Sequence, residues 1–107
     1  MDKAVIDTIS RFKQALLQQG LKVNRVILYG SQATGKAKEH SDIDIVAISD
    51  DFEGMNILER LETIGLAMAE ARIMEPIEPL AYTEEEFSLK DRGTFIGDEV
   101  KAKGIEI

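Results

Sequence analysis

The stretch LYGSQATGKAKEHSDIDIVAIS, from Leu28 to Ser49, carries most of the information about this chain. An apolar run ends abruptly at Gly30-Ser31, ten residues follow, and Asp42-Ile43-Asp44 then leads into a second apolar run. A strand that ends at Gly-Ser offers free backbone N–H groups and a hydroxyl to a phosphate. Asp42 and Asp44 point to the same face of a strand, about 6.5–7 Å apart along the chain, where two carboxylates can share hard cations. The pattern predicts a phosphate-binding turn beside a divalent-metal site.

The composition is that of an ordinary globular domain. The chain has 107 residues, of which 44% are hydrophobic and 31% charged, so we expect a single domain over residues 1–107. No apolar run approaches the roughly 18 residues of a membrane span, and the N-terminal sequence lacks a signal-peptide pattern. The absence of cysteine excludes disulfides and cysteine-based zinc sites. We therefore expect a cytoplasmic protein without a membrane partner.

The net charge of −7 is unevenly distributed along the chain. Residues 1–49 contain seven Lys/Arg against five Asp/Glu, residues 50–91 three against twelve, and residues 92–107 three of each. An acidic middle argues against direct nucleic-acid binding, which depends on neutralising phosphates with Lys and Arg. Positive charges gather instead at Lys36 and Lys38, beside the Gly-Ser turn, where a small phosphorylated ligand would lie. The simpler interpretation is that these charges only keep the surface soluble.

Periodicity and turn residues predict a mixed α/β order. In sequence, we expect a helix over 2–19, a strand over 22–29, a short helical segment over 31–38, a strand over 41–49, a helix from the N-cap Asn56 to 72, an apolar strand over 76–83, a helix that begins after Thr83 and a helical piece over 95–103. Two prolines place strand 76–83 at a sheet edge. The fold class is α/β (α+β), a small mixed sheet with helices mainly on one face.

The helix over 56–72 is predicted to bury one apolar stripe. The residues at helical spacing are Ile57, Leu61, Ile64, Met68 and Ala71. Gly65 lowers helix stability by up to about 1 kcal/mol and is expected to mark a close approach to another backbone.

Gly30-Ser31, ten residues and then Asp42-Ile43-Asp44 resemble the signature of the polymerase-β-type nucleotidyltransferase superfamily. The chain length and the SDIDIVAIS context are similar to its minimal branch, the MNT-domain proteins, and the resemblance covers residues 24 to about 87. It implies a polymerase-β-type core and two-metal nucleotidyl transfer, typically from ATP. In that scheme Asp42 and Asp44 hold Mg²⁺, and Gly30 and Ser31 hold the β- and γ-phosphates. An acceptor hydroxyl attacks the α-phosphorus and pyrophosphate leaves.

Two positions depart from the family pattern. The third carboxylate of the family corresponds here to Glu78, where members often have Asp, and it would help to bind the metal that faces the nucleophile. Thr34 stands where an Arg is common in the Gly-Ser link. Lys36 would supply the missing charge to a triphosphate, as a point charge rather than a bidentate group.

Other conspicuous side chains receive structural interpretations. His40, the only histidine, titrates near neutral pH but lies in a polar loop, so we expect an ordinary surface residue. Tyr29 and Tyr82 lie in apolar strands and are expected in the core. Residues 84–86 are three glutamates at a helix start, where negative charge suits the helix dipole.

Three functional hypotheses follow. The first is a transferase that moves AMP from ATP onto a tyrosine hydroxyl of a partner protein, since the resemblance implies an antitoxin paired with an all-helical HEPN-domain toxin. The second is a non-catalytic antitoxin that neutralises its partner by binding. The third is a transferase acting on a small molecule, which the length disfavours because about 24 residues after the last strand are too few for an acceptor domain. An incomplete site would borrow its acceptor from a partner or from another copy in a homo-oligomer.

Overall fold

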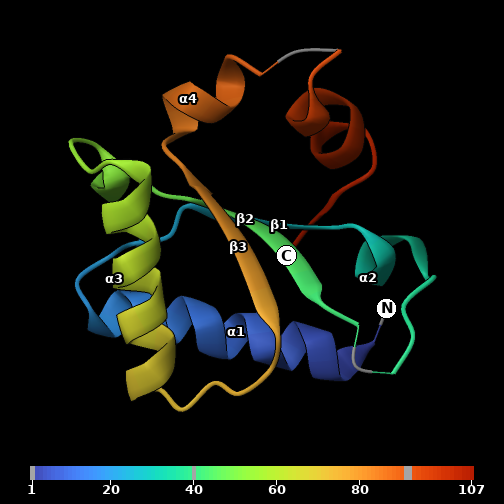
Figure 1. Ribbon diagram of the computed structural model, residues 1–107, viewed down its shortest axis with the longest axis horizontal. Helices are drawn as coiled ribbons and strands as arrows, with labels where there is room; N and C mark the ends of the chain where they lie inside the picture. Colours follow the sequence, from blue (N-terminus) through green and yellow to red (C-terminus); the bar gives the residue numbers. More distant parts are fainter. Residues whose placement is uncertain (1, 40, 91–92) are drawn as a thin grey trace.

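The computed structural model describes residues 2–39, 41–90 and 93–107 (Figure 1). In chain order the elements are α1 (Lys3–Gln18), β1 (Arg25–Tyr29), α2 (Ser31–Thr34), β2 (Ile43–Ile48), the 3₁₀ segment η1 (Asp50–Phe52), α3 (Ile57–Glu70), β3 (Ile77–Tyr82), α4 (Glu84–Ser88), the π-helix η2 (Ile96–Lys101) and β4 (Ile105–Glu106). The predicted order of elements is confirmed. Every helix within these ranges is too short or too polar to cross a membrane.

The four strands form one mixed sheet in the order β3-β2-β1-β4. β1 and β2 are antiparallel, and their register places Tyr29 opposite Asp44. β3 is parallel to β2 and places Glu78 opposite Asp44 on the other side. Parallel neighbours require a crossover, and α3 supplies it between β2 and β3. As predicted from its prolines, β3 is an edge strand.

The two long helices, α1 and α3, cover one face of the sheet (Figure 1). α1 begins at the N-cap Asp2 and buries Val5, Ile9, Phe12 and Leu16, which recur at helical spacing. These side chains pack on sheet residues that alternate along β1 and β2, namely Val26, Leu28, Ile43, Ile45 and Ala47. The mixed sheet with its main helices on one face is therefore confirmed.

The opposite face carries a second, smaller core. Its sheet residues are Ile27, Tyr29, Val46 and Ile48, and α4 and η2 cover them with Phe87, Ile96 and Val100. η2 closes with a tight contact, because a Cβ on Gly104 would lie 2.4 Å from the Val100 carbonyl oxygen. The chain then returns as β4, which pairs with β1. Asp44 and Glu78 belong to this face by strand alternation, at the end away from α4.

Three predicted elements were too long. The first strand, predicted over 22–29, begins at Arg25. The helical segment after Ser31 ends at Thr34, because Gly35 adopts a left-handed conformation (φ 77°) and closes the turn. β2 begins at Ile43, so Asp42 precedes the strand and is exposed. His40 lies outside the described residues.

The predicted buried stripe of α3 was partly wrong. The side chains that α3 buries are Arg60, Ile64 and Ala67, whereas Ile57 is 69% and Leu61 39% exposed. The expected close approach at Gly65 is not made by any described residue of this chain, since a Cβ there would meet nothing within 4 Å. α3 therefore presents part of its apolar side to solvent.

Arg60 explains this orientation of α3. Its Nε donates to the Met55 carbonyl oxygen (2.9 Å) and Nη1 donates to that of Ala81 (3.2 Å). Nη1 and Nη2 also donate to the two carboxylate oxygens of Glu86, at 2.6 and 3.0 Å. Such a bidentate pair is geometrically demanding, so it fixes the rotation of α3 relative to β3 and α4. The periodicity of apolar residues cannot predict these bonds of Arg60.

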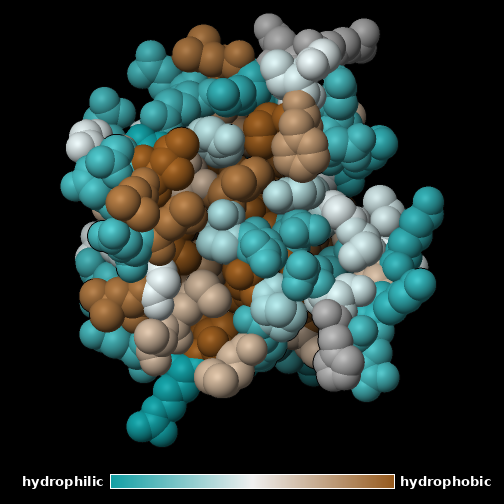
Figure 2. All heavy atoms as spheres, viewed as in Figure 1, coloured by the Kyte–Doolittle hydropathy of each residue, from teal (hydrophilic) through white to brown (hydrophobic). Residues whose placement is uncertain are grey.

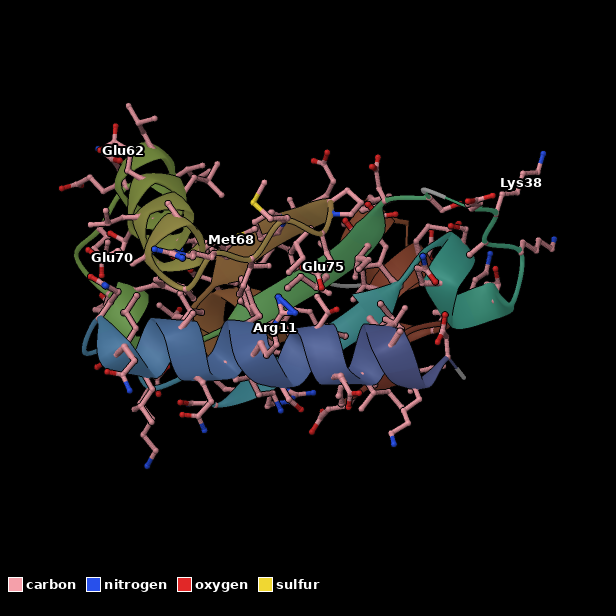
Figure 3. All side chains as sticks on the ribbon, turned by 90° about the horizontal axis from the view of Figure 1, so that it is seen from below. Arg11, Lys38, Glu62, Met68, Glu70 and Glu75 are labelled. Carbon is pink, nitrogen blue, oxygen red and sulfur yellow. The ribbon has the colours of Figure 1, made fainter. Side chains whose placement is uncertain are left out.

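A second bidentate pair holds α1 against the segment that precedes β3. Arg11 donates to both carboxylate oxygens of Glu75, each at 2.9 Å, and the two side chains point toward one another in Figure 3. The Thr8 hydroxyl also donates to Glu75. The Arg11 guanidinium, the Thr8 hydroxyl and backbone N–H groups lower the pKa of the Glu75 carboxyl, the backbone donors first. These bonds fix where β3 begins.

Because of the ion pair between Arg60 and Glu86, the free energy of unfolding depends on pH. Hydrogen bonds from Arg60 first, and from the Thr83 backbone, lower the pKa of Glu86 to about 2. A carboxylate with a depressed folded-state pKa stabilises the fold above its unfolded pKa, and this contribution is lost as pH falls toward the folded value. We expect Glu86→Gln to lower the free energy of unfolding at pH 7 by about 1–2 kcal/mol, the lower part of the range for hydrogen bonds to charged groups because Glu86 is partly exposed.

The measurement is urea unfolding from pH 7 to pH 2.5. The difference between wild type and Glu86→Gln should shrink between about pH 4.5 and 2.5, the window set by the ordinary glutamate pKa and the lowered one. Glu85→Gln, one residue away and exposed, serves as the control and should follow the wild type. A difference that stays constant with pH would contradict the assignment.

Candidate active site

The turn after β1 is shaped by the contact of Gly30 with Asp44. Gly30 has φ 72° and ψ −153°, a conformation that favours glycine. A Cβ at this position would lie 2.5 Å from Oδ2 of Asp44, so any larger residue would be both strained and in collision with the carboxylate. The sequence motif thus has a geometric reason. The Gly30 backbone and the Asp44 carboxylate are in direct proximity.

α2 is a single helical turn that directs the chain away from Asp44. The Gly30 carbonyl accepts from the backbone N–H groups of Ala33 and Thr34, at 3.1 and 3.2 Å. The Thr34 hydroxyl donates to the same carbonyl (3.3 Å). Thr34, the position where the family commonly has Arg, therefore stabilises the turn. Ser31 is half-buried beside it, and Lys36 is exposed just beyond Gly35.

Asp42 and Asp44 form a pair of mutually repelling carboxylates at the start of β2. Asp44 is half-buried and Asp42 exposed. Burial first, and then the negative charge of Asp42, raise the pKa of the Asp44 carboxyl. Both effects penalise a bare carboxylate, and a bound cation would relieve both.

Glu78 lies on the neighbouring strand, opposite Asp44, and is exposed. Its negative charge is close enough to contribute to the raised pKa of Tyr29. Within residues 2–39, 41–90 and 93–107, however, no three acidic or histidine side chains converge tightly enough to enclose an ion. The fold therefore brings Glu78 to the right strand position without gathering three carboxylates around one point.

The donor set suits Mg²⁺. Mg²⁺ prefers hard oxygen ligands, and proteins usually hold it through one or two carboxylates, with phosphate oxygens and water completing the shell. Asp42 and Asp44 supply such a pair, and Asp44 lies directly beside the backbone of the Gly30 turn. A third protein carboxylate is not required for this mode of binding.

An aromatic pair beside the carboxylates was not anticipated from the sequence. Tyr29, opposite Asp44, is buried as predicted, whereas Phe95 at the start of η2 is 56% exposed. The two rings are in edge-to-face contact, with centroids 5.7 Å apart. Burial first, followed by the negative charge of Asp44, raises the pKa of Tyr29 to about 12, so its hydroxyl stays protonated. The exposed ring of Phe95 thus contacts Tyr29, which in turn lies opposite Asp44 in the sheet.

Phe95 was missed because it lies far along the chain from the motif. The residues before it, Gly93 and Thr94, are small or polar, Ile96 and Gly97 follow, and no periodic pattern connects it to Asp44. The only signal in the sequence is a large aromatic residue in a polar segment. Tyr82, by contrast, is partly buried against the second core, as expected, and Lys90 lies over its ring at 5.5 Å.

Comparison with known proteins supports a single assignment. Residues 9–106 match the family model described as a nucleotidyltransferase domain. A predicted nucleotidyltransferase from Sulfolobus solfataricus has a similar fold, with a TM-score of 0.56 and 18% identity, over 99% of this chain and 87% of that one. A chain of a toxin–antitoxin crystal structure with AMP-PNP has a TM-score of 0.56 and 14% identity, over 91% of this chain and 69% of that one.

A further structural likeness is to a protein that is not described as a nucleotidyltransferase. BolA1 from Arabidopsis thaliana has a TM-score of 0.53 and 20% identity, over 74% of this chain and 94% of that one. A search of curated proteins finds no match. The assignment therefore depends on the family model, which spans nearly the whole chain and includes the Gly30 turn, Asp42, Asp44 and Glu78. This chain belongs to the nucleotidyltransferase domain family.

Proposed function

We propose that this nucleotidyltransferase transfers AMP from ATP to a tyrosine hydroxyl of a helical partner toxin, and so acts as an antitoxin. The observation that carries the proposal is the proximity of the Gly30 turn to two carboxylates that repel one another. Such a site is suited to a cation together with a polyphosphate. The likeness to a toxin–antitoxin structure with AMP-PNP supports the choice of nucleotide and partner.

In this proposal each group of the site has one role. Asp42 and Asp44 hold Mg²⁺, and Glu78 assists from the neighbouring strand on the acceptor side. The backbone of Gly30 and Ser31 and the Ser31 hydroxyl donate to the β- and γ-phosphates, and Lys36 adds positive charge. Bound Mg²⁺ supplies charge neutralisation on the attacking and leaving oxygens. The tyrosine hydroxyl gives up its proton to water, its oxygen bonds to the α-phosphorus, the bond between the α-phosphorus and the β-phosphate oxygen breaks, and pyrophosphate leaves.

The exposed ring of Phe95 provides a place for the nucleobase. A base that stacks on an aromatic side chain gains about 1–3 kcal/mol and needs no particular hydrogen-bonding edge. The contact of Phe95 with Tyr29, and the position of Tyr29 opposite Asp44, place the ring on the same face of the sheet as the acidic pair. We infer that the base lies against Phe95 while the phosphates lie at the Gly30 turn.

A non-catalytic antitoxin is the second candidate, and two observations favour it. No three carboxylates enclose an ion among the described residues. Thr34 closes the α2 turn where the family commonly has a charged Arg. A protein that binds nucleotide and neutralises its partner by occlusion would tolerate both features.

The test incubates the protein with α-labelled ATP, Mg²⁺ and the protein encoded by the adjacent gene, and follows intact mass. We expect one added AMP per partner molecule, with the rate reduced at least ~100-fold in Asp42→Asn/Asp44→Asn because the metal-binding charges are lost. Asp7→Asn/Glu85→Gln removes two exposed charges elsewhere and should leave the rate unchanged. If Asp42→Asn/Asp44→Asn still neutralises the partner, the non-catalytic alternative is favoured.

A separate experiment addresses Phe95. Phe95→Ala should raise the Kd for ATP with Mg²⁺ about tenfold, as expected for the loss of one stacking contact, and leave the Kd for inorganic tripolyphosphate unchanged. Phe95→Trp should retain ATP binding because it keeps an aromatic face. Isothermal titration calorimetry measures the Kd of each ligand for the wild type and for the variants. Equal weakening of both ligands in Phe95→Ala would show that the ring supports the fold of the site and does not contact the base.

A further inference from the structure

α3 exposes several large apolar side chains to solvent. The exposed residues spread over about half of the helix circumference, with Glu62 between Leu58 and Leu66, and define the α3 outer face: Ile57, Leu58, Leu61, Gly65 and Leu66. Its four large aliphatic side chains are 39–69% exposed. Hydrophobic residues gather over α3 in the view of Figure 2. Isolated exposed leucines need no explanation, but four on one helix indicate an interaction surface.

Gly65 marks the middle of this face. A Cβ at Gly65 would meet nothing within 4 Å, so no contact within the described residues requires a glycine there. A glycine inside a helix weakens it, and its remaining use is to let another backbone approach closely. The missing side chain leaves a shallow depression between Leu61 and Leu66, which a partner's side chains would fill.

Charge identifies the kind of partner. α3 carries Glu59, Glu62 and Glu70, and its one positive residue, Arg60, is buried and bonded to Glu86. Glu62 projects from the helix in Figure 3, whereas Glu70 accepts a hydrogen bond from Gln19 at the end of α1. Residues 50–91 as a whole contain twelve acidic and three basic side chains. The apolar face is therefore bordered by negative charge, which attracts a basic surface and repels a second copy of this chain or an anionic membrane.

The adjacent sheet edge excludes strand addition as the mode of binding. β3 is the edge strand, but Pro79 in its middle has no N–H to offer. Arg60 already donates to the carbonyl oxygen of Ala81, which faces away from β2. A partner that docks here must use side-chain packing on α3. A helix laid along the apolar face is the geometry that fits.

We propose that the α3 outer face binds an amphipathic helix of a partner protein, apolar along one side and flanked by lysine or arginine. Asp44 and Glu78 belong to the opposite face of the sheet from the core that α3 covers. A helix docked on α3 therefore leaves the carboxylate site open, and binding of the partner and of nucleotide are separable. The proposal does not depend on whether the chain catalyses transfer.

The test uses a designed 18-residue leucine–lysine peptide with an amphipathic helical pattern, titrated into the ¹⁵N-labelled protein. Amide shift changes should map to residues 57–70. Leu58→Gln/Leu61→Gln should weaken binding at least tenfold. The matched control, Leu17→Gln/Leu89→Gln, alters two leucines that are similarly exposed elsewhere and should bind as the wild type does. ATP binding with Mg²⁺ should be the same in both double variants, which separates this proposal from the proposed function.

A third variant distinguishes loss of peptide binding from loss of folding. Gly65→Gln should raise the thermal midpoint, because glutamine favours a helix more than glycine, and should still weaken peptide binding at least fivefold by filling the depression. Tight binding by a scrambled leucine–lysine peptide, or binding unchanged in all α3 variants, would overturn the proposal. So would self-association in sedimentation velocity that Leu58→Gln/Leu61→Gln abolishes, because a second copy would then cover the face.

Discussion

The close contact of Gly30 with the Asp44 carboxylate is the constraint on which the site depends. It needs a glycine for two independent reasons, a left-handed φ of 72° and a Cβ that would lie 2.5 Å from Oδ2. The antiparallel register of β1 and β2 creates the contact, because it sets Tyr29 opposite Asp44 and leaves Gly30 to turn away at the strand end. A backbone turn and a half-buried carboxylate are thereby held together by the sheet itself, so the site is largely formed before any ligand arrives.

The rest of the molecule supports this contact, and the two faces of the sheet are covered to different extents. α1 and α3 bury one face in the main core, and α3 carries the chain across so that β3 can add Glu78 beside Asp44. α4 and η2 cover only part of the other face, which leaves the acidic end accessible and places Phe95 next to Tyr29. Polar bonds fix the arrangement: Arg60 with Glu86 orients α3, and Arg11 with Glu75 anchors the start of β3.

The sequence predicted local features well and non-local ones poorly. The order of elements, the edge position of β3 and the nearness of the Gly-Ser turn to the aspartates follow from turn residues and strand alternation within one short stretch. The rotation of α3 was mispredicted because one buried arginine outweighed the apolar periodicity. Phe95 was missed because only tertiary packing brings it to Tyr29. The roles of Glu78 and Lys36 stay predictions, since no hydrogen bond or ion pair to another described residue holds either side chain in place.

The most direct measurement of the central claim compares two glycines by calorimetric titration with Mg²⁺ and a non-hydrolysable ATP analogue. Gly30 and Gly35 both have positive φ, but they differ in ψ: Gly30 (ψ −153°) lies in a region that essentially only glycine adopts, whereas Gly35 (ψ 13°) is left-handed helical. Alanine therefore strains the backbone more at Gly30, and only there would the new Cβ meet Asp44, so Gly35→Ala controls for the loss of a glycine from the same turn. The account predicts that Gly30→Ala abolishes binding and that Gly35→Ala binds within about threefold of the wild type. Equal affinities for the two variants, whether both retained or both lost, would contradict it.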